Sequence, residues 1–391
     1  MRIAIVGGQL QGVEAAYLAR MARYEVVLLD KNPTPLALKL ASEFHRVDVV
    51  REPERTRKIL STVAVLLPAT ENAEALQALA EYCTRAGIPY LHDAHAYSIS
   101  SSKVKSNLLF ARIGIPTPRA WPNCQFPVIM KPSGQSGSKG VKLARNNHEL
   151  RQFQKELMLL GDEIVTEEFV SGPSLSVEVI AHEGEGICLP VTQLLFDRAY
   201  DCKRVVVPAQ MTPEVAQSLT ESALKIARKL GLTGIMDVEV MVGEGIPKVI
   251  EIDARLPSQT PIAVYHASGI NMVEKLVRLF CQGSLPECPA TANLAVNLEH
   301  FKIAGDHLEV VGETCLAGRL PLNLFTGLGG ADQVLTDYVP GSRDWVATVI
   351  ITGSSPANVE EKRDKFLNQL IRDHKLRYFS DPKPPVEEMV G

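Results

Sequence analysis

Val249-Ile250-Glu251-Ile252-Asp253-Ala254-Arg255 alternates apolar and polar side chains, and Met236-Asp237-Val238-Glu239-Val240 does the same a little upstream. A period of two is typical of a half-buried strand, so the acidic side chains of each stretch share one face. Gly243-Glu244-Gly245 between them favours a tight turn. The pattern predicts an antiparallel hairpin that brings Glu239, Glu251 and Asp253 together.

Carboxylates this close repel one another unless a cation lies between them, and hard oxygen ligands suit Mg²⁺. We therefore expect a metal site on this hairpin. An ordinary hairpin with a solvated polar face is the alternative that spacing alone leaves open.

The composition is typical of a globular protein with an extensive core. The chain has 391 residues, enough for two or three domains, with 46% hydrophobic and 22% charged residues. Lys and Arg number 41 and Asp and Glu 45, so the net charge is 41 − 45 = −4. This balance does not favour nucleic acid as a partner.

The seven cysteines are scattered without a C-x-x-C pair, which is typical of reduced thiols rather than a disulfide framework. Met1-Arg2 leads directly into a strand-like run without a leader pattern, and an 18-residue apolar stretch is absent. We expect a cytoplasmic protein without a membrane partner.

The N-terminal stretch predicts a βαβ unit. Apolar runs at Ile3–Val6 and Val26–Leu29 flank the turn Gly7-Gly8-Gln9-Leu10-Gln11-Gly12 and a helical pattern. Such a turn presents backbone N–H groups at a helix N-terminus, which favours a phosphate or another small ligand. Gln9 stands where a nicotinamide-binding turn needs glycine, so that match is partial.

Glu71 follows another predicted strand, Val63–Leu67. Strand-end loops of a parallel sheet face its ligand crevice, so Glu71 is a candidate for binding a cationic group. A charge that stabilises the N-terminus of the following helix is the alternative.

The central part combines lysines with a glycine-rich loop. A helix carrying Lys103 precedes the strand Phe126–Lys131, which runs into Ser133-Gly134-Gln135-Ser136-Gly137-Ser138-Lys139-Gly140. We call residues 133–140 the flap. Its glycines would let backbone N–H groups approach a phosphate, and the lysines would neutralise it. A mobile surface turn is the alternative.

Two further strands and a helix are predicted before the hairpin: Ile164–Val170, which contains Glu167-Glu168-Phe169-Val170, Ser174–Ile180, and a helix over Thr212–Leu230. The remainder, residues 291–391, is expected to form a C-terminal lobe, with residues 381–391 as a poorly ordered tail.

Five features follow one another along the chain: a βαβ module, a lysine helix, a strand ending in lysine before a glycine flap, a Glu-Glu-Phe-Val strand and an acidic hairpin ending in arginine. In this order they resemble the ATP-grasp carboxylate-amine ligases. The resemblance covers about residues 1–285. It implies an α/β protein with an α+β central part: a Rossmann-like parallel-sheet domain (1–95), an ATP-grasp domain (96–290) with its nucleotide lobe at about 103–170 and metal hairpin at 234–256, and the C-terminal lobe.

Within that superfamily the sequence is most similar to the pyrrolysine-biosynthesis ligases. The closer match lies in Gly7–Gly12, Asp30-Lys31-Asn32-Pro33, Gly234–Glu239 and Ile250–Pro261. These ligases join 3-methylornithine to the side-chain amine of lysine through an acyl phosphate formed from ATP. The resemblance leaves the oligomeric state open, with a homodimer among the candidates.

The resemblance also implies roles for individual residues. It assigns the nucleotide to Leu10, Gln11, Asp30, Lys103, Lys131, Ser138, Glu167, Glu168, Phe169 and Val170. It assigns the substrates to Gln9, Glu71, Ser176, Val177 and Glu178, and Mg²⁺ to Glu239, Glu251 and Asp253. Arg255 and Lys131 would act on the transferred phosphoryl group. Many relatives have asparagine at the position of Asp253, so the third metal ligand stays open.

The expected activity is ATP-dependent ligation of (3R)-3-methyl-D-ornithine to the ε-amine of L-lysine, with release of ADP and phosphate. An ATP-grasp ligase of another carboxylate, from amino-acid or purine metabolism, is the main alternative. A nicotinamide oxidoreductase or a non-catalytic nucleotide-binding regulator is a further one.

Overall fold

The computed structural model describes residues 1–285, 287 and 291–384. The chain forms two compact units. The first contains Met1–His92, Lys203–Pro208 and Leu256–Pro382, and the second contains Asp93–Cys202 and Ala209–Arg255. This grouping divides the chain differently from the predicted domains, whose boundaries stay a prediction. Among the described helices, none has the length and apolar character needed to cross a membrane.

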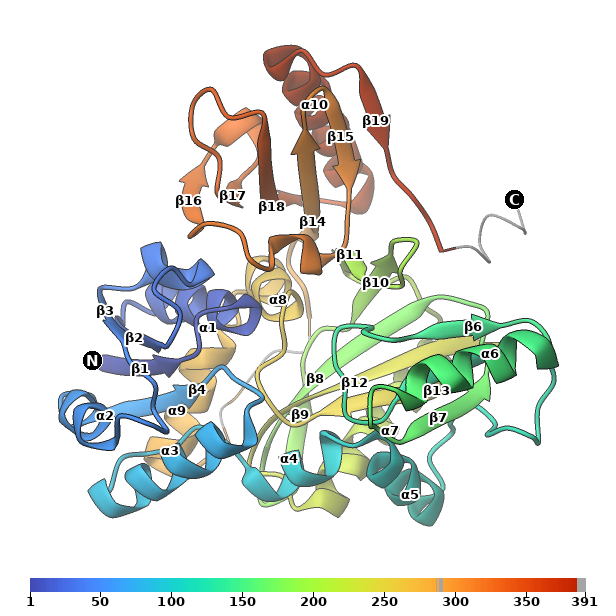
Figure 1. Ribbon diagram of the computed structural model, residues 1–391, viewed down its shortest axis with the longest axis horizontal. Helices are drawn as coiled ribbons and strands as arrows, with labels where there is room; N and C mark the ends of the chain where they lie inside the picture. Colours follow the sequence, from blue (N-terminus) through green and yellow to red (C-terminus); the bar gives the residue numbers. More distant parts are fainter. Residues whose placement is uncertain (286, 288–290, 385–391) are drawn as a thin grey trace. The chain divides into compact units, whose positions relative to one another are not determined.

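The first unit begins with a parallel sheet (Figure 1) in the order β3-β2-β1-β4. Its strands are β1 (Arg2–Val6), β2 (Glu25–Asp30), β3 (Glu43–Arg46) and β4 (Val65–Pro68), accompanied by α1 (Leu10–Met21), α2 (Pro53–Leu60) and α3 (Ala73–Ala86). The two central strands, β1 and β2, are continuous apolar runs because both faces of a parallel sheet are buried. The predicted βαβ unit is confirmed.

Two glycines bring α1 close to this sheet. Gly7 has a φ of +102°, and a Cβ at this position would lie 2.1 Å from the carbonyl oxygen of Ala69. A Cβ on Gly12 would lie 2.2 Å from the carbonyl oxygen of Gly7. Larger residues would push the helix away from the strand ends, so the turn needs glycine at both positions.

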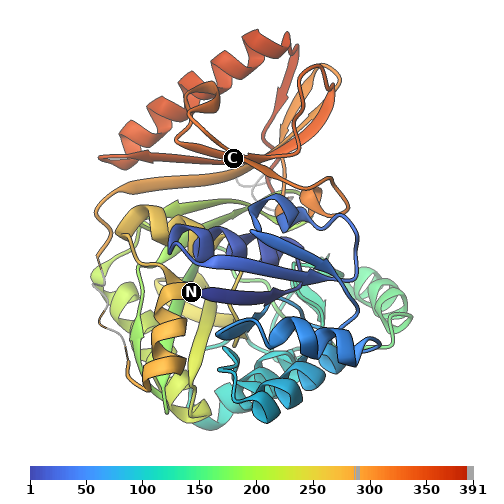
Figure 2. The same cartoon turned by 90° about the vertical axis from the view of Figure 1, so that its left-hand side faces the viewer.

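The rest of the first unit is a mainly antiparallel sheet with helices. Its central pair is β14 (Ala295–Ala304) and β18 (Asp344–Gly353). The other elements are β11 (Cys202–Val207), β15 (His307–Val310), β16 (Asn323–Thr326), β17 (Gln333–Thr336), β19 (Tyr378–Ser380), α8 (Thr260–Ser268), α9 (Met272–Gln282) and α10 (Pro356–His374). Figure 2 shows α10 along one face of this sheet. Phe366 of this helix packs on Phe301 of β14.

Part of the predicted poorly ordered tail is held by this unit. Asp381 accepts hydrogen bonds from Lys203 and Arg204. Residues 385–391 of that tail lie outside the described residues.

The second unit contains a small antiparallel sheet in the order β6-β5-β7. Its elements are β5 (Val128–Pro132), β6 (Lys142–Ala144), β7 (Ile164–Glu168) and the covering helix α6 (Asn147–Met158). Pairing of β5 with β6 places the flap at the tip of a hairpin. The sequence did not lead us to predict α6, although its side chains Leu150 and Leu157 pack on this sheet.

A second antiparallel set of strands in this unit has the order β13-β12-β8-β10. Its strands are β8 (Ser174–His182), β9 (Glu185–Cys188, paired with β8), β10 (Thr192–Phe196), β12 (Gly234–Gly243) and β13 (Ile246–Asp253), and its helices are α4 (Ala94–Ser100), α5 (Lys103–Ile113) and α7 (Pro213–Leu230). The helix predicted over Thr212–Leu230 is confirmed, with Thr212 as its N-cap and Gly231 at its end.

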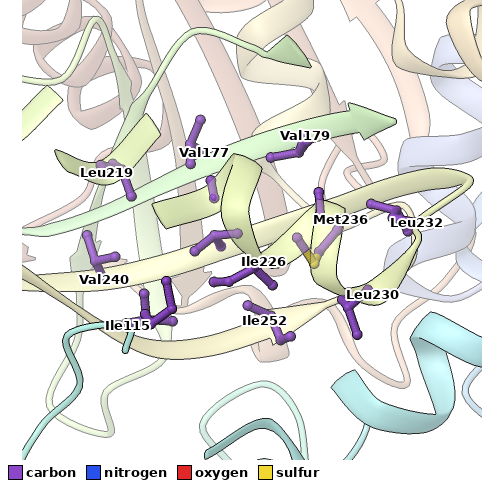
Figure 3. Close-up of a cluster of buried hydrophobic side chains, with 14 of the residues drawn as sticks. Ile115, Val177, Val179, Leu219, Ile226, Leu230, Leu232, Met236, Val240 and Ile252 are labelled. Carbon is purple, nitrogen blue, oxygen red and sulfur yellow. The ribbon is translucent and has the colours of Figure 1, made fainter. Parts of the chain in front are cut away.

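One face of these strands forms the core of the second unit. Figure 3 shows Val177, Met236, Val240 and Ile252 pointing toward Ile226 of α7 and its neighbours. Since side chains alternate along a strand, the residues between them lie on the opposite face. That opposite face carries the acidic residues.

Candidate nucleotide and metal site

The acidic hairpin forms as predicted. Strands β12 and β13 pair antiparallel, with Glu239 opposite Glu251 and Asp237 opposite Asp253. The turn residues Glu244 and Gly245 have φ of 52° and 77°, as a tight two-residue hairpin turn requires.

Strand β8 extends this pattern by one strand. Ser176 lies opposite Glu239, and Glu178 lies opposite Asp237. The face therefore carries two rows of side chains. Row one is Ser176, Glu239 and Glu251; row two is Glu178, Asp237 and Asp253.

Two buried lysines accompany row one. The Lys103 ammonium lies 2.6 Å from Glu251 Oε1 and donates to the carbonyl oxygen of Gln135 in the flap, also at 2.6 Å. The Lys131 ammonium lies 2.6 Å from Glu167 Oε1 and donates to the carbonyl oxygen of Ile250 at 2.9 Å. The structure thus brings Lys103 and Lys131, which lie far upstream in the sequence, to the predicted pair Glu239 and Glu251.

The electrostatics of row one reflect this crowding. Burial and, to a smaller extent, the neighbouring Glu251 carboxylate raise the pKa of Glu239 to about 7, although Lys103 and Lys131 oppose this shift. Glu239 is therefore a site at which a cation is favourable.

In row two, Arg255 forms an ion pair with Asp253 at 2.8 Å. Asp237 is 6% exposed, and its Oδ1 has no hydrogen-bond partner among the described residues. Burial and the carboxylates of Glu239 and Asp253 raise the pKa of Asp237 well above its ordinary value. A buried oxygen of this kind favours a ligand that donates hydrogen bonds. The sequence did not lead us to predict Asp237 as a site residue, although it lies two residues before Glu239 and therefore on the same face of the strand.

The donor set fits Mg²⁺ bound together with a nucleotide. Within the described residues, no group of three or more His, Cys, Asp or Glu is arranged to hold a metal ion by itself. Mg²⁺ is commonly held by one or two carboxylates plus substrate phosphates, and the opposed pair Glu239 and Glu251 supplies two. Asp253 is engaged with Arg255, so its role as a third ligand stays a prediction.

The flap is tied to the rest of the second unit at several points. Ser138 Oγ donates to the carbonyl oxygen of Tyr200 at 2.5 Å, and the Gly134 N–H donates to Asp162 Oδ2 at 2.8 Å. Together with the bond from Lys103 to Gln135, these contacts hold the flap without a regular secondary structure.

The segment predicted to hold adenine follows directly on β7. The Phe169 N–H donates to the carbonyl oxygen of Pro127 at 3.1 Å. Val170 is buried, and its N–H has no acceptor in the described part of the chain. This N–H can donate a hydrogen bond to an acceptor on the edge of a nucleotide base.

The Glu168 carboxylate is already occupied. It accepts hydrogen bonds from Lys248, and from Arg119 at 2.7 Å. Burial would raise the pKa of Glu168, but these two cations outweigh burial and lower it to about 2. Glu168 therefore stays ionised, and we expect only its backbone to meet a nucleotide.

The predicted substrate strand divides between two faces. Ser176 and Glu178 lie on the acidic face, whereas Val177 is fully buried in the core opposite. Its side chain therefore points away from the rows, and only its backbone can contribute there.

The remaining predicted residues belong to the first unit. Gln9 precedes α1, and Gln11 Nε2 donates to the carbonyl oxygen of Leu256 at 3.0 Å. Asp30 accepts hydrogen bonds from the N–H groups of Gly8 and Asn32 at 2.7 and 2.8 Å, so it orders the turn that contains Leu10. Glu71 is exposed on the loop before α3. A site shared between these residues and the rows stays a prediction.

Comparisons with known proteins identify the family to which the chain is similar. The ATP-grasp domain family matches residues 100–259. A 3-methyl-D-ornithine–L-lysine ligase from Methanosarcina acetivorans is 40% identical over 291 residues, which cover 73% of this chain and 76% of that protein.

Solved structures show the same fold. A biotin carboxylase from Campylobacter jejuni matches with a TM-score of 0.73 at 17% identity, over 94% of this chain and 91% of its own. An L-amino acid ligase from Bacillus licheniformis matches with a TM-score of 0.70 at 15% identity, over 94% of this chain and 97% of its own. The fold and the family expected from the sequence are confirmed.

Proposed function

The chain belongs to the ATP-grasp carboxylate-amine ligases, and from this premise we propose that it joins (3R)-3-methyl-D-ornithine to the ε-amine of L-lysine in pyrrolysine biosynthesis. The observation that carries the proposal is the opposed pair Glu239 and Glu251 beside two buried lysines, in a chain 40% identical to a ligase named for this reaction. ATP and Mg²⁺ are the implied cofactors.

The nucleotide would lie over row one. Lys103 and Lys131 would exchange their internal partners for phosphate oxygens, and the flap backbone would cover the phosphates. The Val170 N–H would meet the base. Mg²⁺, held by Glu239 and Glu251, would supply positive charge to the phosphates during transfer.

Formation of an amide from a carboxylate requires that the carboxylate first be activated, and the proposed arrangement fits this requirement. A carboxylate is a poor electrophile, so phosphorylation of its oxygen supplies a leaving group. Arg255 and Lys131 would stabilise the charge on the transferred phosphoryl group. The neutral ε-amine of lysine would then attack the acyl carbon and release phosphate. Water exclusion by the flap would protect the acyl phosphate from hydrolysis.

Row two suits the amino acid that is activated. An ornithine-like substrate carries ammonium groups, and Glu178 and Asp237 offer buried carboxylate oxygens for one of them, with Ser176 beside them. Gln9 and Glu71 would hold the lysine substrate, with Glu71 on its α-ammonium group. Leu10, Gln11 and Asp30 would shape the adjoining turn.

A cytoplasmic location is also part of the proposal. It is supported by the described cysteines, including the buried Cys83 and the exposed Cys281, which are all free thiols.

The test is a reaction of purified protein with ATP, Mg²⁺, L-lysine and either 3-methyl-D-ornithine or D-ornithine. We expect ADP, phosphate and a dipeptide mass that require both amino acids. Absence of lysine-dependent ADP release would contradict the proposal. ADP release with another amino acid or with bicarbonate in a substrate panel would instead assign a different carboxylate.

A further inference from the structure

Lys103 makes a contact that a nucleotide-binding lysine does not need. Its side chain is 8% exposed, and its ammonium lies at 2.6 Å from both Glu251 Oε1 and the carbonyl oxygen of Gln135. Lys103 is the first residue of α5, next to the N-cap Ser102, whose hydroxyl lies 3.1 Å from the hydroxyl of Ser133 in the flap. One side chain thus links a helix, the flap and the acidic hairpin.

This contact occupies a carboxylate that the proposed function gives to the metal. A divalent cation bound to this carboxylate would lie close to the Lys103 ammonium, and repulsion between the two positive charges disfavours the binding of both. Removing a cation from a buried carboxylate leaves an uncompensated charge, which is strongly unfavourable. Glu251 will therefore hold Lys103 until another cation replaces it.

Lys131 is not equivalent, although it is equally buried. Its ammonium is held by Glu167 and the carbonyl oxygen of Ile250. Neither partner belongs to the opposed pair. Lys103 is thus the cation that competes directly for Glu251.

We propose that Lys103 is a latch that blocks the metal site until a nucleotide arrives. Without nucleotide, its ammonium neutralises Glu251 and holds the flap through Gln135. Nucleotide phosphates attract Lys103, which frees Glu251 for the metal and the flap carbonyl at once. The inference rests on the proposed function, because it takes Glu251 as a metal ligand.

The latch predicts that the nucleotide-free protein binds a divalent cation poorly because of Lys103 alone. We would titrate the full chain with Mn²⁺ without nucleotide and measure free Mn²⁺ by electron paramagnetic resonance. Lys103→Met is expected to lower the Mn²⁺ dissociation constant at least about tenfold, because it leaves Glu251 unpaired. Lys103→Arg keeps the charge and should bind Mn²⁺ as weakly as the wild type.

Lys105→Met is the matched control. Lys105 lies on the same helix, is exposed and donates to the carbonyl oxygen of Ser98 at 3.1 Å, so its loss should not change the affinity. Adding Glu251→Gln to Lys103→Met should remove the gain. Equal Mn²⁺ affinity of Lys103→Met and the wild type would overturn the latch.

The flap gives a second readout. Loss of the bond to Gln135 should speed cleavage by trypsin after Lys139 in nucleotide-free Lys103→Met, relative to Lys105→Met. An unchanged cleavage rate would contradict the shared release of flap and metal site. If the wild type ligates its substrates but Mn²⁺ affinity does not respond to Lys103, the latch fails alone. If Glu251→Gln leaves Mn²⁺ binding to the nucleotide complex intact, the metal assignment fails as well.

Discussion

Rows one and two carry the same kind of charge on neighbouring positions of the same strands, but the protein treats them differently. In row one, Lys103 pairs with Glu251 and, together with Lys131, opposes the raised pKa of Glu239. In row two, Asp237 keeps a buried oxygen without a partner in the described residues. The carboxylates of row one are neutralised by lysines that a metal and phosphates can replace. The buried carboxylate of Asp237 in row two instead lacks a hydrogen-bond donor in the described residues, and an ammonium group of a substrate can supply one.

The largest effect should come from row one. Glu251→Gln keeps the shape of the side chain but removes the charge that would hold the metal, so turnover should fall by at least about 10²-fold. Steady-state kinetics measure the loss, and circular dichroism should show a folded protein. Turnover near the wild-type value would remove Glu251 from the metal site and make the two rows equivalent.

Row two should respond through substrate binding. Asp237→Asn removes a carboxylate proposed to meet an ammonium group, so the KM for the ornithine-like substrate should rise about tenfold, a typical loss for one charged hydrogen bond. The KM for ATP should change little. The thermal midpoint should not fall, because the substitution relieves a buried charge.

Asp364 is an exposed residue on α10, and the Asp364→Asn variant tests whether the loss of any negative charge changes the KM values. A rise in the KM for ATP in Asp237→Asn, with none for the amino acid, would place row two in the nucleotide site instead.

Glu168 differs from the carboxylates of both rows because two cationic side chains, Lys248 and Arg119, donate hydrogen bonds to it. Its pKa is lowered from 4.5 to about 2, so this stabilisation is present above about pH 4.5 and is lost as the pH falls toward 2. Lys248→Met should reduce the free energy of unfolding at pH 7 by about 1 kcal/mol, since Arg119 remains as a partner.

Urea denaturation of the wild type and Lys248→Met measures this difference, which should stay nearly constant down to about pH 3 and shrink as the pH falls from there toward 2. A difference that stays constant with pH would mean that Lys248 stabilises the protein by packing rather than by its charge.

The two rows also show what the sequence could predict. The alternation at 236–240 and 249–255 predicted the hairpin, because a period of two and a glycine turn are local properties. Pairing of Lys103 with Glu251, or of Glu168 with Lys248, joins residues far apart in the chain and has no local pattern. Val177 was assigned to the substrate site by resemblance, together with Ser176 and Glu178. The alternation of side chains along β8 instead puts the Val177 side chain in the core. Helix α8 was not predicted, because a buried apolar helix has no polar face to reveal its period.

The smallest effect should lie at an exposed acid. Glu71 is exposed on its loop, where solvent screens its charge, unlike the buried Asp237. Glu71→Ala should therefore raise the KM for lysine only about threefold, in line with the weak contribution of exposed ion pairs, and leave the KM for ATP unchanged. Glu74→Ala, an exposed acid in the first turn of α3, is the matched control and should have no effect. An effect of Glu71→Ala on ATP alone would remove this residue from the amine site. An effect as large as that of Asp237→Asn would show that burial does not decide how strongly these carboxylates bind an ammonium group.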